Sequence, residues 1–244
     1  MALELHPLDQ FKIAPLFHIT LPGGVDASFT NAALFMCVAV AVAAGLVVFG
    51  ARRRDLVPGR WQSLAELAYE FIAGMIDENV GHEGQQYFTF LFTLFMFVLL
   101  GNLLGLIPYG YVFTGQIIVT FALAAVVFLG VTIIGIVRHG WRFLTFFVPH
   151  GVPLVLLIIL VPIEVLSYFI RPFTLAIRLF ANMMAGHTML AIFGGFVAAM
   201  GLLGILPLSV DVLLIFLELL VAVLQAYVFT ILSCLYLRDA IHLH

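Results

Sequence analysis

Charge is scarce in this 244-residue chain. Only 9% of the residues are Asp, Glu, Lys or Arg, a single lysine (Lys12) is present, and the formal net charge is -3. Cations so few and scattered form no basic face for nucleic acid. In contrast, 64% of the residues are hydrophobic, more than a soluble domain of this size can bury. The composition therefore predicts an all-α integral membrane protein, since helices satisfy their own backbone groups in lipid.

Cysteine and the usual catalytic motifs are also scarce. Cys37 and Cys234 fall in separate apolar runs, which is typical of packing residues rather than of a disulfide or a metal site. The sequence contains no Gly-rich phosphate loop, HExxH, CxxC or G-x-S-x-G motif. We therefore expect no catalytic, cofactor-binding or metal-binding site in this chain alone.

Two apolar runs end in basic residues and set the expected topology. Residues 31–50 are long enough to cross a hydrocarbon core of about 30 Å, and Arg52, Arg53 and Arg54 follow them. Residues 116–137 end at Arg138. Because basic residues favour the cytoplasmic side, both ends are predicted to be inside. Residues 1–30 lack the basic start and apolar core of a signal peptide and are expected to form an N-terminal segment outside.

Residues 61–79 alternate apolar and acidic side chains with helical spacing. Leu64, Leu67 and Phe71 recur on one face, and acidic residues such as Glu66 and Glu70 lie between them. This pattern predicts an amphipathic helix on the inner membrane surface. Packing against a soluble partner is the alternative interpretation.

A second span is predicted at residues 87–107. Its glycines, Gly101 and Gly105, lie four residues apart and would let a neighbouring helix approach closely. Asn102 lies between them. An intramembrane Asn either forms an interhelical hydrogen bond or lines a hydrated path, and the sequence leaves both interpretations open.

Arg178 lies inside an apolar run from Val148 to Leu208. Only Glu164 and Arg171 are also formally charged in this run. A fixed positive charge near the bilayer centre costs about 2.5 to 3.5 kcal/mol on insertion scales. Arg keeps its proton at any accessible pH, so Arg178 suits an electrostatic partner or barrier and requires a carboxylate opposite it.

Helical spacing groups the polar residues of the last two spans. At about 100° per residue, Glu164, Arg171, Arg178 and Asn182 form one stripe, in which Arg171 either snorkels or pairs with Glu164. Every seventh residue of the final span, residues 211–237, is polar, although the first of these positions could also lie in an outer loop. These positions are Asp211, Glu218 and Gln225.

Antiparallel packing of the last two spans predicts two contacts. Glu218 would approach His187, and Gln225 would approach Arg178. A carboxylate beside a histidine is suited to proton transfer, although His187 and Gln225 could equally be satisfied interhelical hydrogen-bonding residues.

The run RLFANMMAGH at residues 178–187, with Glu164 before it and ELLVAVLQAYVF at residues 218–229, resembles subunit a of the F-type ATP synthases. The resemblance covers most of the chain. It implies that residues 148–208 form one long tilted helix rather than two passes broken at Pro172, and that the last two helices pack as a hairpin along a rotor ring.

The resemblance also implies the function. A member of this family is a non-catalytic, proton-translocating stator subunit with two offset half-channels separated by an essential Arg. The positions of this sequence that match the proton path are Arg178, Glu218, His187, Asn182, Gln225, Glu164 and Asn102.

The implied partners are the c-ring subunits, the b-type peripheral stalk subunits, membrane lipids and protons. We expect the bacterial inner membrane, with the mitochondrial inner membrane as the alternative. A proton-coupled secondary transporter and a structural membrane subunit are the other functional classes considered, although no internal duplication typical of transporters is visible.

These observations predict a single membrane domain over residues 1–244, with about five transmembrane helices and one interfacial helix. Its expected parts are residues 1–30, 31–50, 61–79, 87–137 and 148–238.

Overall fold

The structure is a computed structural model that describes residues 9–18, 28–52, 58–107, 110–148 and 153–242. The predictions that concern Arg53 and Arg54 lie outside these ranges. Within these ranges, five helices are long and apolar enough to cross a membrane. The predicted all-α membrane fold with about five spans is therefore confirmed.

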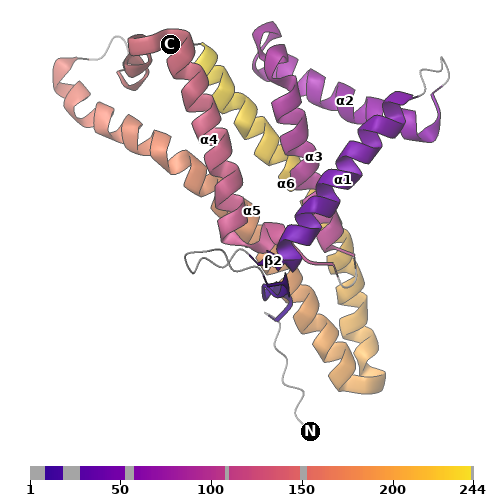
Figure 1. Cartoon of the computed structure of the whole chain (residues 1–244). Coiled ribbons are helices and arrows are strands. Elements are labelled where there is room, and N and C mark those ends of the chain that lie inside the picture. The colour runs from indigo at the N-terminus through magenta and orange to yellow at the C-terminus, as the bar shows by residue number, and fades with distance from the viewer. Residues whose placement is uncertain (1–8, 19–27, 53–57, 108–109, 149–152, 243–244) are drawn as a thin grey trace.

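Six α-helices form the structure (Figure 1). The predicted spans correspond to α1, α3, α4, α5 and α6, and the amphipathic segment corresponds to α2. Their bounds are α1 Asn31–Arg52, α2 Arg60–Asn79, α3 Phe88–Gly105, α4 Ile117–His139, α5 Leu154–Met200 and α6 Ile205–Ile241.

Short elements connect or precede these helices. They comprise the 3-10 helices η1 Asp9–Phe11, η2 His82–Tyr87, η3 Phe113–Gly115, η4 Gly140–Phe147 and η5 Gly201–Gly204, and the strands β1 Pro15–Phe17 and β2 Phe29–Thr30. The antiparallel pair β1–β2 is a departure from the all-α prediction. It went unpredicted because strands of two or three residues are too short to show an alternating pattern.

α5 is a single helix of 47 residues, about 70 Å long at 1.5 Å per residue. This is more than twice the hydrocarbon thickness of about 30 Å, so the helix must incline or extend beyond the core. Pro162 and Pro172 lie inside it without ending it, as membrane helices tolerate. The predicted single long helix is confirmed. Figure 1 shows α5 and α6 joined at a tip that extends past the other helices.

The core forms where α2, α3, α4, α5 and α6 meet. The face of α2 near its C-terminal end is fully buried there through Ile72 and Ile76, whereas Leu64 and Leu67 nearer its start are 50% and 68% exposed. The predicted amphipathic helix therefore packs on the protein with one half and presents exposed apolar residues with the other.

The two glycines of α3 make room for a loop rather than for a helix. A Cβ on Gly101 would lie 2.5 Å from Cζ of Phe113, and one on Gly105 would lie 2.6 Å from Cγ2 of Val112. Both neighbours belong to the connection between α3 and α4. The expectation that another helix approaches these glycines is therefore wrong, because spacing alone does not identify what packs against a small residue.

The N-terminal segment is held against this connection. The carbonyl oxygen of Phe11 accepts hydrogen bonds from the Tyr111 hydroxyl at 3.2 Å and from the Gln116 amide at 2.7 Å. Burial raises the pKa of Tyr111 above its usual value, and the Gln116 hydrogen bond opposes this. The phenol therefore stays protonated and remains a donor.

The first prediction concerns topology. Figure 1 places the β1–β2 pair and the C-terminal end of α6 at opposite ends of the bundle. In a background without Cys37 and Cys234, we expect Lys12→Cys to react with an impermeant thiol reagent only from the outside and His242→Cys only from the inside. Labelling of both from the same face would contradict five crossings.

Candidate functional site

The contact between α5 and α6 brings most of the predicted polar residues together. His187 Nε2 lies 3.3 Å from Glu218 Oε1, and their side chains are only 8% and 4% exposed. The contact lacks hydrogen-bond geometry, since both atoms remain without a hydrogen-bond partner. The predicted approach of Glu218 to His187 is confirmed, and it places a buried carboxylate beside a buried imidazole.

Asn182 and Gln225 form a second contact between the same helices. The Asn182 amide donates a hydrogen bond of 2.8 Å to Oε1 of Gln225. Gln225 is thus bonded one helical turn from Arg178, and its closer approach to Arg178 stays a prediction. The register of two packed helices depends on side-chain size at the contact, which spacing along each helix does not contain.

Asn102 joins this group from α3. It is completely buried, and its Nδ2 donates a hydrogen bond of 3.2 Å to the carbonyl oxygen of Ala222, one turn from Glu218. Of the two interpretations that the sequence left open, the interhelical hydrogen bond is present. The Oδ1 atom of Asn102 accepts no hydrogen bond from a described residue, so this oxygen can accept one from another donor.

Several further polar atoms near this region are buried without a hydrogen-bond partner. Unsatisfied buried polar atoms are rare in proteins, so their concentration around one carboxylate sets this part of the described chain apart. The atoms are Asn102 Oδ1, Thr114 Oγ1, His187 Nε2, Asp211 Oδ1, both carboxylate oxygens of Glu218, and Gln225 Nε2.

Asp211 and Gly186 complete the surroundings of Glu218. Asp211 lies within α6 and is partly buried, so the possibility that it belongs to an outer loop is wrong. A Cβ on Gly186 would lie 2.7 Å from Oε1 of Glu218. The carboxylate therefore lies directly against Gly186, and a side chain there would displace it.

The N-terminal segment covers His187. Gln10 donates a hydrogen bond of 3.1 Å to the His187 carbonyl oxygen, and the Phe11 ring meets the imidazole edge-on with centroids 6.3 Å apart. Sequence reasoning missed both residues, because their segment carries no periodicity that relates it to α5.

Arg178 lies about 13 Å along α5 from His187 at the usual helical rise. Its side chain is exposed, and no described residue forms a hydrogen bond or an ion pair with it. The apolar residues Phe173 and Ile177 beside it on α5 are 51% and 52% exposed. The positions one turn before and one turn after it on the same face are polar and also exposed, so the fixed charge lies on an uncovered polar stripe that apolar residues border.

Arg171 has a different partner from the one expected. Its Nη1 lies 3.0 Å from Oδ2 of Asp239 on α6, so neither of the two alternatives considered, snorkelling or pairing with Glu164, describes it. The guanidinium also lies over the rings of Phe146, Tyr168 and Tyr236, at 5.8, 5.5 and 5.1 Å from their centroids. Glu164 is partly buried on α5, and no described residue forms an ion pair with it.

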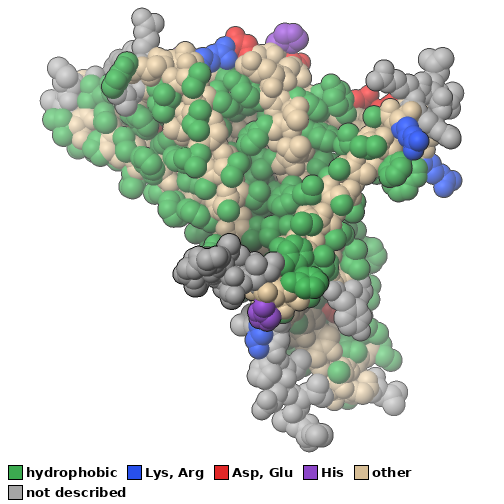
Figure 2. All heavy atoms as spheres, in the orientation of Figure 1, with side chains coloured by type: hydrophobic (Ala, Val, Ile, Leu, Met, Phe, Trp, Pro, Cys, Tyr) green, Lys and Arg blue, Asp and Glu red, His purple; other side chains and the backbone are tan. Residues whose placement is uncertain are grey.

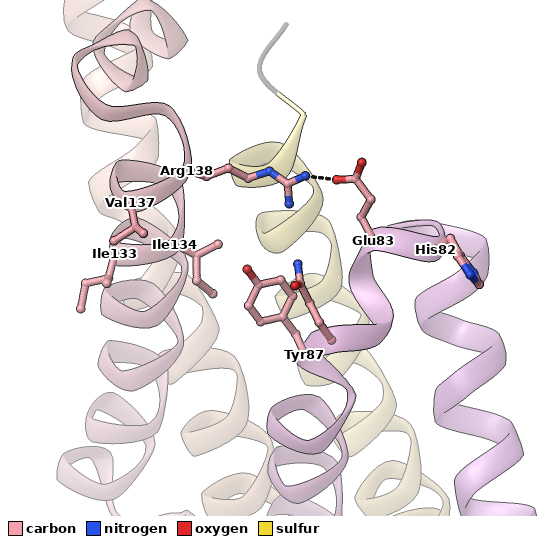
Figure 3. Close-up of a pocket in the computed structure, with 8 residues that line it drawn as sticks. His82, Glu83, Tyr87, Ile133, Ile134, Val137 and Arg138 are labelled. Atoms are coloured by element: carbon pink, nitrogen blue, oxygen red, sulfur yellow. Dashed lines mark hydrogen bonds and ion pairs between the residues drawn. The ribbon is translucent and has the colours of Figure 1, made fainter.

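A pocket of about 710 Å³ lies elsewhere, between η2 and α4 (Figure 3). Figure 3 shows Arg138 and Glu83 paired across it, with Tyr87 and Ile134 below. None of the seven predicted site residues lines this pocket. Among the described residues, no group of three His, Cys, Asp or Glu side chains is placed to hold a metal ion.

In the described part of the chain, five apolar helices with a carboxylate and an imidazole buried between the last two define a polytopic membrane protein. Residues 33–238 match the family described as ATP synthase A chain. The chain belongs to this family, as its resemblance predicted.

Curated relatives agree with this assignment over nearly their whole length. The chain is 53% identical to the ATP synthase subunit a of Paramagnetospirillum magneticum over 246 residues, which cover 98% of this chain and 99% of the relative. It is 52% identical to that of Rhodospirillum rubrum over 239 residues, with the same coverage. The protein of Parvibaculum lavamentivorans is 53% identical over 97% of this chain and 93% of its own length. These relatives are bacterial, and the predicted multi-pass location in the bacterial inner membrane is confirmed.

The second prediction concerns the ion pair between α5 and α6. Asp239→Asn leaves the partly buried Arg171 without its counter-ion, and we expect a loss of about 1 to 3 kcal/mol of stability and a lower midpoint of thermal unfolding in detergent. Asp239→Glu is the matched control that retains the charge. An unchanged midpoint for Asp239→Asn would mean that the aromatic rings alone hold Arg171.

Proposed function

We propose that this chain is the proton-translocating stator subunit of a rotary F-type ATP synthase and is itself non-catalytic. The observation that carries the proposal is the arrangement on α5 and α6. A buried carboxylate–imidazole pair, His187 with Glu218, lies toward the tip of the hairpin, and the exposed fixed charge of Arg178 lies further along α5.

The uptake half-channel follows the buried polar atoms without partners. Asn102, Gln225 and Asn182 lie within one or two helical turns of the Glu218–His187 pair through the contacts described above. Amide groups with a free donor or acceptor can hold water, and water chains between titratable groups carry protons. Glu218 and His187 would pass protons along this path from the outer side.

Arg178 would separate this path from the release path. Glu164 lies about 21 Å from Arg178 along α5 on the side opposite to His187, and it is the titratable residue assigned to release. A permanent positive charge repels a proton that crosses directly, and it favours the ionised form of a carboxylate brought next to it. A proton carried on such a carboxylate would therefore leave before the carboxylate passes Arg178.

The carboxylate that Arg178 requires would be supplied by another subunit. No described residue forms an ion pair with Arg178, and exposed apolar residues border its polar stripe on α5. On α6, the apolar residues Leu217, Leu220 and Leu224 are also exposed, by 56%, 61% and 51%. An uncovered cation bordered by apolar residues suits a lipid-embedded ring that presents a carboxylate. We assign this carboxylate to the c-ring. The b-type stalk subunits would hold the chain in place beside the ring.

Rotation follows from the energy available. One elementary charge moved through 100 mV yields about 2.3 kcal/mol, which is too little for ATP synthesis in one step. Several proton transfers must accumulate, as a ring that turns past a fixed Arg allows.

The third prediction concerns Arg178. Arg178→Ala should abolish ATP-driven proton pumping and raise passive proton leak at least tenfold, because a charge at 4 to 8 Å contributes a barrier of about 2 to 4 kcal/mol at an effective dielectric of 20. Arg178→Lys should also fail to restore coupling, since Lys can lose its proton when desolvated and lacks the planar fork.

The measurement is proton flux in vesicles containing the whole reconstituted complex, with and without ATP. Arg238→Ala removes a charge from the exposed inner end of α6 and serves as the control. Coupled pumping at a near-normal rate in Arg178→Ala would reject the stator function and leave the structural-subunit alternative.

The fourth prediction concerns the buried pair. Glu218→Gln should slow proton uptake by about 100-fold, the lower range for loss of a proton-transferring group. The exchange His187→Glu with Glu218→His should retain part of the flux, because the acid and the base only change places. ATP-driven quenching of a pH-sensitive dye measures both variants, and normal quenching in Glu218→Gln would exclude the relay.

A further inference from the structure

A groove of about 960 Å³ lies between α1 and the beginning of α2, far in sequence from every residue of the proton path. Its α1 wall is a stripe of apolar residues at helical spacing, and its other wall is the first turn of α2. The stripe consists of Val38, Ala41, Val42, Gly45, Leu46 and Phe49.

Two arginines and an indole form the inner end of this groove. Arg52 ends the α1 stripe, and Arg60 and Trp61 begin the α2 wall. Both arginines are exposed, and neither forms an ion pair with a described residue. The nearest acidic residue of α2, Glu66, accepts a hydrogen bond of 2.8 Å from Gln62. Figure 2 shows Lys or Arg side chains where α1 and α2 meet, next to hydrophobic surface.

The corner between the two helices is tight. A Cβ on Gly50 would lie 2.5 Å from Cβ of Ala65 and 3.3 Å from the Trp61 carbonyl oxygen. Gly50 thus lets the end of α1 touch α2. The groove lies along α1 from this corner toward the bilayer centre.

The length and polarity of the groove fit one leaflet. From Val38 to Phe49 the apolar stripe extends about 16 Å along α1, close to half of the hydrocarbon core at about 15 Å, and Arg52 follows it by about one turn. Its cationic end is the end that the positive-inside rule places in the cytoplasm. Trp61 is 68% exposed, as expected of an aromatic residue at headgroup depth.

We propose that this groove is a binding site for an anionic phospholipid of the inner leaflet. Arg52 and Arg60 bind the headgroup phosphate, and one acyl chain lies along the α1 stripe. Basic pockets between membrane helices on the cytoplasmic side recognise anionic headgroups in this way. At about fivefold per cation near the surface, two arginines give a preference of about five- to thirtyfold over a zwitterionic lipid. The site is independent of the proton path.

Gly45 permits a variant that blocks the acyl chain without changing the charge. A Cβ there would meet only the Phe49 ring, at 3.9 Å, so a larger side chain enters the groove without displacing backbone. Gly45→Phe should fill the groove, and Gly45→Leu is the smaller alternative if assembly of the complex fails.

The experiment uses the whole ATP synthase complex in lipid nanodiscs. Phosphatidylglycerol and phosphatidylcholine probes carry the same photoactivatable acyl chain, and mass spectrometry quantifies labelling of residues 38–49. We expect phosphatidylglycerol to label these residues five- to thirtyfold more than phosphatidylcholine, with a smaller difference at high salt. Arg52→Gln with Arg60→Gln should bring the ratio near one, Gly45→Phe should lower both labels, and Arg238→Gln should change neither.

Two results would overturn the proposal. Equal labelling by both lipids in the unmodified protein would show that the arginines select no headgroup. Labelling that is absent in the complex but present in the isolated chain would show that a protein helix occupies the groove instead of a lipid.

Discussion

The single fixed charge of Arg178 constrains the rest of the molecule. A cation at membrane depth is costly in lipid, and no described residue forms an ion pair with it. Arg171, two turns away on the same helix, is neutralised by Asp239 and surrounded by three aromatic rings. Two arginines on one stripe thus have opposite environments: one stabilises the packing of α5 on α6, and the other is left for a partner.

The register of α5 against α6 determines what the remaining polar residues can do. Three contacts fix this register. They are the Arg171–Asp239 ion pair, the Asn182–Gln225 hydrogen bond and the His187–Glu218 contact. A shift of one helical turn would place an apolar side chain against Glu218. The ion pair is therefore more than local stabilisation, because it helps to keep the titratable pair aligned many residues away.

Much of this fold follows from the sequence, and the limits are physical. Runs of apolar residues and their basic ends predicted the spans, and period seven predicted the shared face of Glu218 and Gln225. The partners of Arg171, Gly101 and Gly105 could not be predicted, because they depend on contacts between segments that spacing within one segment does not encode. The role of Gln10 and Phe11 over His187 was missed for the same reason.

The buried polar region depends on space as much as on hydrogen bonds. Glu218 contacts His187 without hydrogen-bond geometry, and both of its oxygens lack partners. A fully satisfied carboxylate would be held in one protonation state by its donors, whereas an unsatisfied one exchanges protons with whatever fills the adjacent volume. Gly186 supplies part of that volume by lacking a side chain. The proposed proton path therefore requires the absence of strong local partners around Glu218, just as the proposed barrier requires their absence around Arg178.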